Sequence, residues 1–219
     1  MTEVVQGKLR QGTAGRDWEV HSARWLLIGA FVAALLVAGA CRDEAPPLAG
    51  TSLDGKPSPE FRLTDQRGAP VALAELRGSP VVLTFLYTTC PDICPLTAEK
   101  LRQTFEQLGK DAGKVAMVAI SVDPERDTAD AAAEFTAQHR LDGWNWHYLT
   151  GTRADLEPVW ASYGIGVIPR YPNVSSTTLD AVGHTDALYV IDRDGRQRTL
   201  LRGDFDPVAL AGGLRGLLK

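Results

Sequence analysis

The sequence lacks a block of basic residues, an internal repeat and an apolar run of full membrane-spanning length. Its 23 Lys and Arg residues are balanced by 27 Asp and Glu residues, giving a formal net charge of −4. Nucleic acid is therefore not an expected partner. Without repeats, the 219 residues fit one ordinary domain plus an appendage. Cysteine is also scarce: the three present are Cys41, Cys90 and Cys94, an odd number that requires separate explanations.

The apolar run nearest the N-terminus covers residues 25–40, which is 16 residues. A helix needs about 20 residues to cross the hydrocarbon core of a bilayer. This run therefore fits the apolar part of a signal segment or a marginal membrane anchor. Arg24 and further basic residues precede it, so we expect them to stay in the cytoplasm and the remainder of the chain to be exported. The predicted location is the cell membrane, with the domain on the extracytoplasmic (periplasmic or outer) face.

Cys41 directly follows the small residues Ala38, Gly39 and Ala40. This pattern resembles a bacterial lipobox, in which the cysteine is acylated and becomes the mature N-terminus. Ala38 departs from the leucine usual at its position, and the lead-in before the apolar run is long. The alternative is therefore an uncleaved anchor that merely ends at Cys41. We predict lipidation at Cys41 and assign residues 1–41 to a signal or anchor segment.

Residues 42–58 contain three prolines and two glycines and show no hydrophobic period. This composition predicts a tether between the membrane and the domain. The domain itself is expected to cover residues 59–219.

Strand-like and helix-like segments alternate along residues 59–219. A βαβ unit followed by a β-hairpin and a terminal helix is the layout of a thioredoxin-like domain. We therefore predict an α/β, thioredoxin-like fold, with a central mixed sheet flanked by helices and an N-terminal β-hairpin extension. The expected hairpin covers residues 61–73; the expected strands are 81–87, 115–122, 144–149, 187–191 and 198–201; the expected helices are 96–108, 128–139, 153–163 and 207–218.

Cys90 and Cys94 lie between the strand at residues 81–87 and the helix at 96–108, with Pro95 suited to the first helical turn. A helix N-terminus favours negative charge, so a thiol there ionises more readily than a free one. Residues four apart share a helix face, with Cβ atoms about 5–6 Å from each other. Two thiolates at that distance can form a disulfide or bind one soft metal ion.

His184 lies in the segment that leads into the strand at residues 187–191. In open α/β sheets, sites form beyond the carboxyl ends of strands. If the strand at 187–191 runs antiparallel to the strand at 81–87, the segment carrying His184 reaches the cysteine pair. The ordinary alternative for a lone loop histidine is an exposed side chain with no function.

Three segments resemble the SCO/SenC family. They are Thr-Cys-Pro-Asp-Ile-Cys-Pro at residues 89–95, Ser-Val-Asp-Pro-Glu-Arg-Asp-Thr at 121–128, and His184 ahead of Leu-Tyr-Val-Ile-Asp-Arg-Asp-Gly at 188–195. The resemblance extends from Phe61 to the C-terminus. The cysteine spacing alone is a weak signal, but the flanking prolines, the second string and the histidine together make it specific. The lipobox-like Cys41 departs from the family's plain transmembrane anchor.

The resemblance implies a thioredoxin-like protein that binds copper through Cys90, Cys94 and His184. It also implies a role in assembling the binuclear copper centre of cytochrome c oxidase. Two thiolates and one imidazole agree with this, because they suit Cu(I), whereas a structural zinc site needs four protein ligands. The delivered ion, Cu(I) or Cu(II), stays open. Expected partners are the copper-bearing oxidase subunit, with a copper donor and a thioredoxin-like reductant as further candidates.

Two functions use the same cysteine pair. The first is a metallochaperone that binds one copper and transfers it. The second is a thiol-disulfide oxidoreductase that reduces cysteines of an oxidase subunit or another exported client. His184 favours the chaperone over the enzyme, because a disulfide reductase does not need an imidazole there. A thiol peroxidase is disfavoured because Tyr87 stands where that class has threonine. Asp92 and Asp123 are close enough in sequence or topology to support the metal ligands, but the expected roles are a helix cap for Asp92 and a strand-end turn residue for Asp123.

Overall fold

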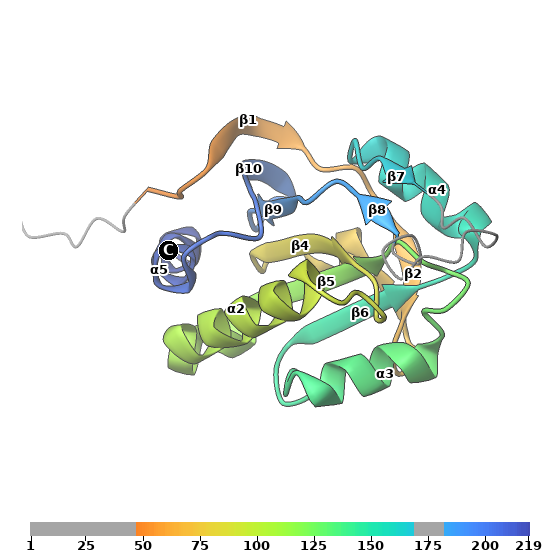
Figure 1. The fold of residues 1–219 in the computed structure, drawn as a ribbon. Helices are drawn as coiled ribbons and strands as arrows, with labels where there is room; N and C mark the ends of the chain where they lie inside the picture. The colour runs from red at the N-terminus through yellow and green to blue at the C-terminus, as the bar shows by residue number, and fades with distance from the viewer. Residues whose placement is uncertain (1–46, 169–181) are drawn as a thin grey trace, which may run out of the picture. The chain divides into compact units, whose positions relative to one another are not determined.

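Eight strands form the sheet at the centre of this structure, a computed structural model that describes residues 47–168 and 182–219. The strand order is β1-β10-β9-β4-β5-β6-β2-β3 (Figure 1). The strands are β1 (Thr51–Pro57), β2 (Arg62–Asp65), β3 (Pro70–Ala72), β4 (Val81–Leu86), β5 (Ala116–Ser121), β6 (Trp146–Thr150), β9 (Leu188–Ile191) and β10 (Arg196–Leu201). A separate ribbon joins β7 (Val167–Ile168) to β8 (Gly183–His184).

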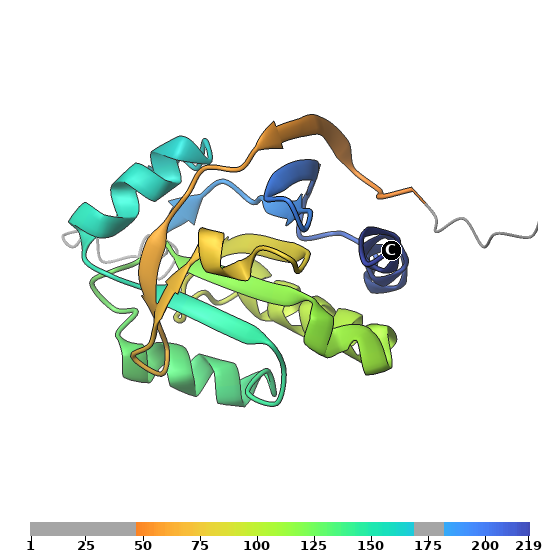
Figure 2. The same ribbon diagram turned by 180° about the vertical axis from the view of Figure 1, so that it is seen from behind.

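The helices are α2 (Ile93–Leu108), α3 (Ala129–Gln138), α4 (Arg153–Ser162) and α5 (Pro207–Leu217), with two short 3₁₀ segments, Leu73–Leu76 and Gly109–Lys114. Helices α2 and α5 lie side by side in both views and contact each other (Figures 1 and 2). Each predicted helix is present, with its ends shifted by a few residues at most. The predicted segment 1–41, including Cys41, lies outside the described residues. Within the described ranges, no helix has the length and apolar character needed to cross a membrane.

The central strands explain why the sheet is mixed. Every residue of β4 and β5 is buried, as expected for strands covered on both faces. Strand β4 pairs in parallel with β5 and antiparallel with β9. The predicted mixed sheet flanked by helices is therefore confirmed, and so is the antiparallel relation between β4 and β9 on which the placement of His184 depended.

The second half of the predicted tether differs from the structure. Residues 51–57 form β1, which pairs antiparallel with β10, and its register shifts between Ser52 and Lys56. Most of its side chains are exposed because it is an edge strand, so it carries no hydrophobic period. Backbone hydrogen bonds to β10 hold β1 in its strand conformation, and such bonds produce no side-chain pattern in the sequence. Ahead of β1, Leu48 packs over Gly213 of α5, where a Cβ would lie 2.5 Å from the Leu48 Cδ2 atom.

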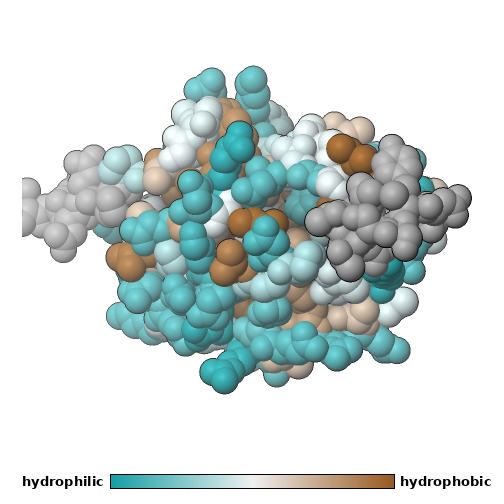
Figure 3. Space-filling view, in the orientation of Figure 1, coloured by the Kyte–Doolittle hydropathy of each residue, from teal (hydrophilic) through white to brown (hydrophobic). Residues whose placement is uncertain are grey.

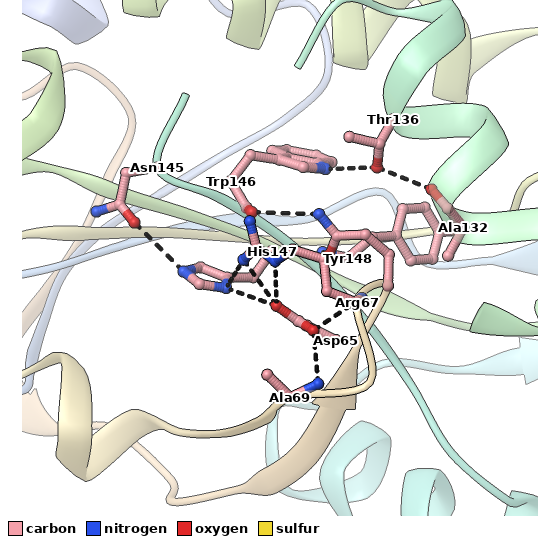
Figure 4. Close-up of polar contacts among 10 residues, drawn as sticks. Asp65, Arg67, Ala69, Ala132, Thr136, Asn145, Trp146, His147 and Tyr148 are labelled. Atoms are coloured by element: carbon pink, nitrogen blue, oxygen red, sulfur yellow. Dashed lines mark hydrogen bonds and ion pairs between the residues drawn. The ribbon is translucent and has the colours of Figure 1, made fainter. Parts of the chain in front are cut away.

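The predicted N-terminal hairpin is β2 and β3, and buried polar contacts attach it to β6 (Figure 4). The Asp65 carboxylate accepts hydrogen bonds from the N–H groups of Arg67 and Ala69, at 2.9 and 3.0 Å. His147 lies against it, with Nδ1 3.4 Å from the Asp65 Oδ2 atom and Nε2 3.3 Å from the Asn145 Oδ1 atom. His147 therefore belongs to the packing of the hairpin and not to the cysteine site.

One face of the molecule is mostly hydrophilic, with small and separate hydrophobic patches (Figure 3). Large hydrophobic side chains that are exposed among the described residues are Leu96, Ile168 and Val208. Scattered apolar residues of this kind are normal on a protein surface. Leu96 is notable for its place in the first turn of α2, two residues after Cys94.

Candidate metal centre

Cys90 and Cys94 lie where β4 ends and α2 begins, beyond the carboxyl end of a central strand. Both are free thiols and both are buried, with 8% of Cys90 and 0% of Cys94 exposed. Helix α2 starts at Ile93, slightly earlier than predicted, so Cys94 lies in the first turn and Pro95 follows it. The proline costs nothing there, because the N–H group it lacks would be unpaired at that position.

The sulfur of Cys90 is the hydrogen-bond acceptor of the pair. It accepts a hydrogen bond from the Cys94 N–H group, and the Cys94 thiol, the Asp92 N–H group and the Tyr87 hydroxyl lie near enough to favour its thiolate form as well. The distance from the Cys94 nitrogen to the Cys90 sulfur is 3.5 Å. The hydrogen bond from the Cys94 thiol lowers the pKa of Cys90 to about 5, although burial opposes it. The same hydrogen bond, together with burial, raises the pKa of Cys94. Cys90 is therefore the thiolate at neutral pH, and Cys94 is the thiol that donates to it.

The lowered pKa of Cys90 predicts a flat pH profile for its alkylation by iodoacetamide. Because the thiolate is fully formed well above a pKa of about 5, the rate at Cys90 should change less than about twofold from about pH 6.5 to 8. An ordinary thiol, with a pKa of about 8.5, becomes about tenfold more reactive per pH unit over that range. Mass spectrometry locates the label on each cysteine, and urea-unfolded protein is the control. A tenfold rise per unit at Cys90 in the folded protein would contradict the assignment.

His184 reaches the same end of the sheet, as predicted from the topology. It lies in β8, opposite Val167 of β7, and its ring packs edge-on against Tyr87 with centroids 5.9 Å apart and planes at 86°. Its Nδ1 atom is 3.1 Å from the Thr185 carbonyl oxygen. Within residues 47–168 and 182–219, no three His, Cys, Asp or Glu side chains lie close enough to hold a metal ion. The structure thus brings His184 to Tyr87, which also contacts Cys90, but does not bring it into a completed ligand set.

Asp127 supports the cysteine loop, a role that the sequence did not reveal. The cap of α3 is the neighbouring Thr128, which accepts from the Ala131 N–H group at 3.1 Å. The Asp127 carboxylate is buried instead. It accepts from Thr88 N at 2.9 Å, Thr88 Oγ1 at 2.7 Å, Ser121 Oγ at 2.6 Å and Tyr148 OH at 3.0 Å. Its one sequence signal is its place in the string at residues 121–128.

Asp127→Ala is expected to lower the free energy of unfolding by roughly 2–4 kcal/mol, because buried donors from three parts of the chain lose their acceptor. Urea unfolding measures this directly. Asp130→Ala, at an exposed position in the same helix, is the matched control and should change stability by about 0.5 kcal/mol or less. Equal urea midpoints for wild type and Asp127→Ala would mean that the carboxylate does not support the loop.

Asp92 and Asp123, the two acidic residues considered as support for the metal ligands, have different surroundings. Asp92 occupies the cap position of α2, but its side chain makes no capping hydrogen bond, and it contributes its backbone N–H group to Cys90. Asp123 is buried just after β5, and this burial, with the nearby charge of Asp127, raises the pKa of Asp123 to about 6. Asp92 therefore acts through its backbone rather than through its carboxylate.

The family model described as SCO1/SenC matches residues 50–219, which includes both cysteines, the string at 121–128 and His184. The chain belongs to the SCO1/SenC family. Among curated relatives, the human mitochondrial protein SCO2 homolog is 36% identical over 143 residues, covering 62% of this chain and 50% of the relative. A putative copper-binding protein of Stutzerimonas stutzeri is 30% identical over 156 residues, covering 70% and 72%. The aligned part spans about half the length of the human and bovine SCO2 homologs.

Solved structures give the same result for this SCO1/SenC chain. Bradyrhizobium japonicum ScoI with copper bound has a TM-score of 0.64 and 31% identity, covering 73% of this chain and 98% of that one. Arabidopsis thaliana ScoI with copper bound has a TM-score of 0.63 and 26% identity, covering 73% and 96%. The resemblance to the SCO/SenC family and the thioredoxin-like fold are both confirmed.

Proposed function

We propose that this SCO1/SenC protein is a metallochaperone that binds one copper through Cys90, Cys94 and His184. It would deliver that copper to the copper-bearing subunit of cytochrome c oxidase. The observation that carries the proposal is the buried pair of free cysteines, with the His184 ring packed against Tyr87, whose carbonyl oxygen accepts a hydrogen bond from the Cys90 N–H group. Support also comes from two relatives solved with copper bound and from a third named as a putative copper-binding protein.

The donor set fits copper better than other common metals. Thiolate and imidazole are soft or borderline ligands, and two sulfurs with one nitrogen suit the low coordination number of Cu(I). A structural zinc site would need a fourth protein ligand. His184 must approach the sulfurs before all three groups can share one ion, because they do not form a ligand set in the described conformation.

A thiol-disulfide oxidoreductase remains the second candidate, and one observation favours it. Thiol-disulfide exchange needs one thiolate and one partner thiol, and the opposite pKa shifts of Cys90 and Cys94 supply that asymmetry. The client would be the cysteines of an oxidase subunit or another exported protein. The two functions share the reduced pair, because oxidation to a disulfide consumes both sulfur ligands.

The state of the acceptor distinguishes these functions in cells that lack this protein. The oxidase subunit is isolated from such cells, and its copper content and free thiols are measured. If the protein is a chaperone, the subunit from these cells should lack copper, but its cysteines should be reduced and should bind added Cu(I). If the protein is a reductase, the cysteines of the subunit should form a disulfide and should bind copper only after a reductant is added. A subunit with its normal copper would contradict both functions.

We further propose that residues 1–41 hold the domain at the extracytoplasmic face of the membrane through an acylated Cys41. Support comes from the apolar run and from the small residues before this cysteine. Cys41→Ser should abolish incorporation of labelled palmitate and leave an unprocessed precursor that is still membrane-bound. If wild type and variant migrate alike and neither takes up lipid, the segment is a simple anchor.

A further inference from the structure

We propose that Asp186 is a positioning residue that fastens the segment carrying His184 to the first turns of α2, where Cys94 lies. The inference rests on the proposed copper site and deepens it by naming a contact that joins the two halves of that site. Asp186 lies two residues after His184, between β8 and β9, and is half-buried. Its side chain reaches from this connection to the loop that follows β10.

A hydrogen bond attaches the Asp186 carboxylate to the loop between β10 and α5. The Oδ2 atom accepts it from the Gly203 N–H group at 2.8 Å. Gly203 is buried, and its carbonyl oxygen accepts from the Nζ atom of Lys100 in α2 at 3.0 Å. The Lys100 ammonium group also lies 5.4 Å from the centroid of the Phe205 ring. Gly203 therefore connects the segment after His184 to α2 through both its N–H group and its carbonyl group.

Gly203 also packs closely against the start of α2. A Cβ atom at this position would lie 3.1 Å from the Thr97 Oγ1 atom, 3.2 Å from the Ile93 Cδ1 atom and 3.3 Å from the Asp186 Oδ2 atom. These separations are shorter than ordinary van der Waals contact, so the three groups meet where a residue without a side chain fits best. Ile93 is the first residue of α2 and Cys94 is the second. The Asp186 carboxylate therefore meets the helix turn that carries Cys94.

The pairing of β8 shows why this contact matters for His184. Strand β8 pairs with β7 over two residues and forms a ribbon apart from the central sheet (Figure 1). The central sheet holds the chain from Ala187, whose carbonyl oxygen accepts from the Thr84 Oγ1 atom of β4 at 3.2 Å. The hydrogen bond of Asp186 fixes the chain one residue closer to His184 and attaches it on the side of α2. Two residues of chain span about 7 Å at most, so the His184 backbone stays within that distance of an attached Asp186.

The Asp186→Ala substitution removes the acceptor. In metal-free, reduced protein, the Gly203 amide should then exchange its hydrogen at least about tenfold faster. The rings of His184 and Tyr87 have centroids 5.9 Å apart, and the nuclear Overhauser signal between them should at least roughly halve, because a loosened segment samples other positions. Cu(I) affinity in a competition assay should fall by about tenfold, as for residues that orient a metal ligand. Asp186→Asn keeps a side-chain oxygen as acceptor, so it should stay within about threefold of wild type in each measurement.

Asp192→Ala is the matched control. Asp192 follows the opposite end of β9, and its Oδ1 atom accepts hydrogen bonds from two backbone N–H groups at the turn into β10, at 3.0 and 2.9 Å. Losing these two bonds should lower stability at least as much as losing the one at Asp186. The exchange of Gly203, the ring signal and the Cu(I) affinity should nevertheless stay as in wild type. This variant separates loss of a carboxylate acceptor in general from loss of the attachment near His184.

A double-mutant cycle with His184→Ala tests whether Asp186 acts through the imidazole. If it does, Asp186→Ala should change Cu(I) affinity by less than about twofold once the imidazole is gone. An equal loss of affinity in the wild-type and His184→Ala backgrounds would mean that Asp186 supports the fold and does not position the ligand.

The metal-free measurements keep this inference separate from the proposed function. Wild-type protein that binds no copper would refute the copper site, and the attachment would then be judged by Gly203 exchange and the ring signal alone. If Asp186→Ala leaves both of these unchanged, or if Asp192→Ala changes them equally, Asp186 does not fasten the His184 segment. Changes in both with unaltered Cu(I) affinity would overturn its role in positioning the ligand, and so would an Asp186→Asn variant as weak as Asp186→Ala.

Discussion

Cys90→Ser and Cys94→Ser are each expected to abolish copper binding by the purified protein, whereas wild type should hold about one copper per chain. Both sulfurs are buried at the end of β4, and the described conformation brings no further cysteine to them. A serine hydroxyl is a poor ligand for Cu(I), which prefers soft donors. The loss of affinity should exceed the about 10- to 100-fold effects of residues that only orient a ligand.

Copper content is measured on protein reduced, loaded with Cu(I) and freed of excess metal. Cys41→Ser is the matched control, because it removes a cysteine to which we assign lipid and not copper; it should keep the full stoichiometry. Wild-type protein oxidised to the Cys90–Cys94 disulfide should bind no copper, since its ligands are consumed. Two or more tightly held coppers per chain, or binding that survives oxidation, would refute this ligand assignment.

His184→Ala is expected to bind copper far more weakly while its cysteine pair still forms and reduces a disulfide at a near-normal potential. Loss of one of three ligands weakens the metal site, but a disulfide needs only the two sulfurs. The groups that lower the pKa of Cys90 belong to Cys94, Asp92 and Tyr87, so they remain in this variant. The two measurements are a competition assay for copper and a redox titration of the pair.

His139→Ala is the control for loss of an imidazole elsewhere. His139 ends α3, and its ring lies 4.3 Å from that of Phe135, so it should change neither measurement. In cells lacking the wild-type protein, His184→Ala should also fail to restore oxidase activity and the copper content of the oxidase. Full oxidase activity with His184→Ala, alongside lost activity with Cys90→Ser, would overturn the chaperone and favour the reductase.

The local sequence was sufficient to predict the elements that carry the site. Continuous apolar runs correspond to β4 and β5, because strands buried on both faces leave an unbroken apolar pattern. The prolines and the four-residue spacing predicted Cys90 and Cys94 at a strand-to-helix junction. The arrival of His184 at that end was predicted on the condition that β9 runs antiparallel to β4, and the structure meets that condition.

Strand β1 and the role of Asp127 depended on the tertiary structure. An exposed edge strand is held by backbone hydrogen bonds, which every residue type except proline can make, so β1 resembled a tether. The Asp127 carboxylate gathers donors from Thr88, Ser121 and Tyr148, which come together only when β4, β5 and β6 are side by side.

Which of the two cysteines is ionised also depends on the tertiary structure. The spacing of Cys90 and Cys94 does not distinguish the two sulfurs, because both lie near the N-terminus of α2. The folded chain makes them unequal, because the Cys94 N–H group donates to the Cys90 sulfur and the nearby Asp92 N–H group and Tyr87 hydroxyl also favour its thiolate form, while Cys94 is fully buried. A sequence pattern fixes which residues are available, but hydrogen-bond direction and burial depend on neighbours that only the folded chain brings together.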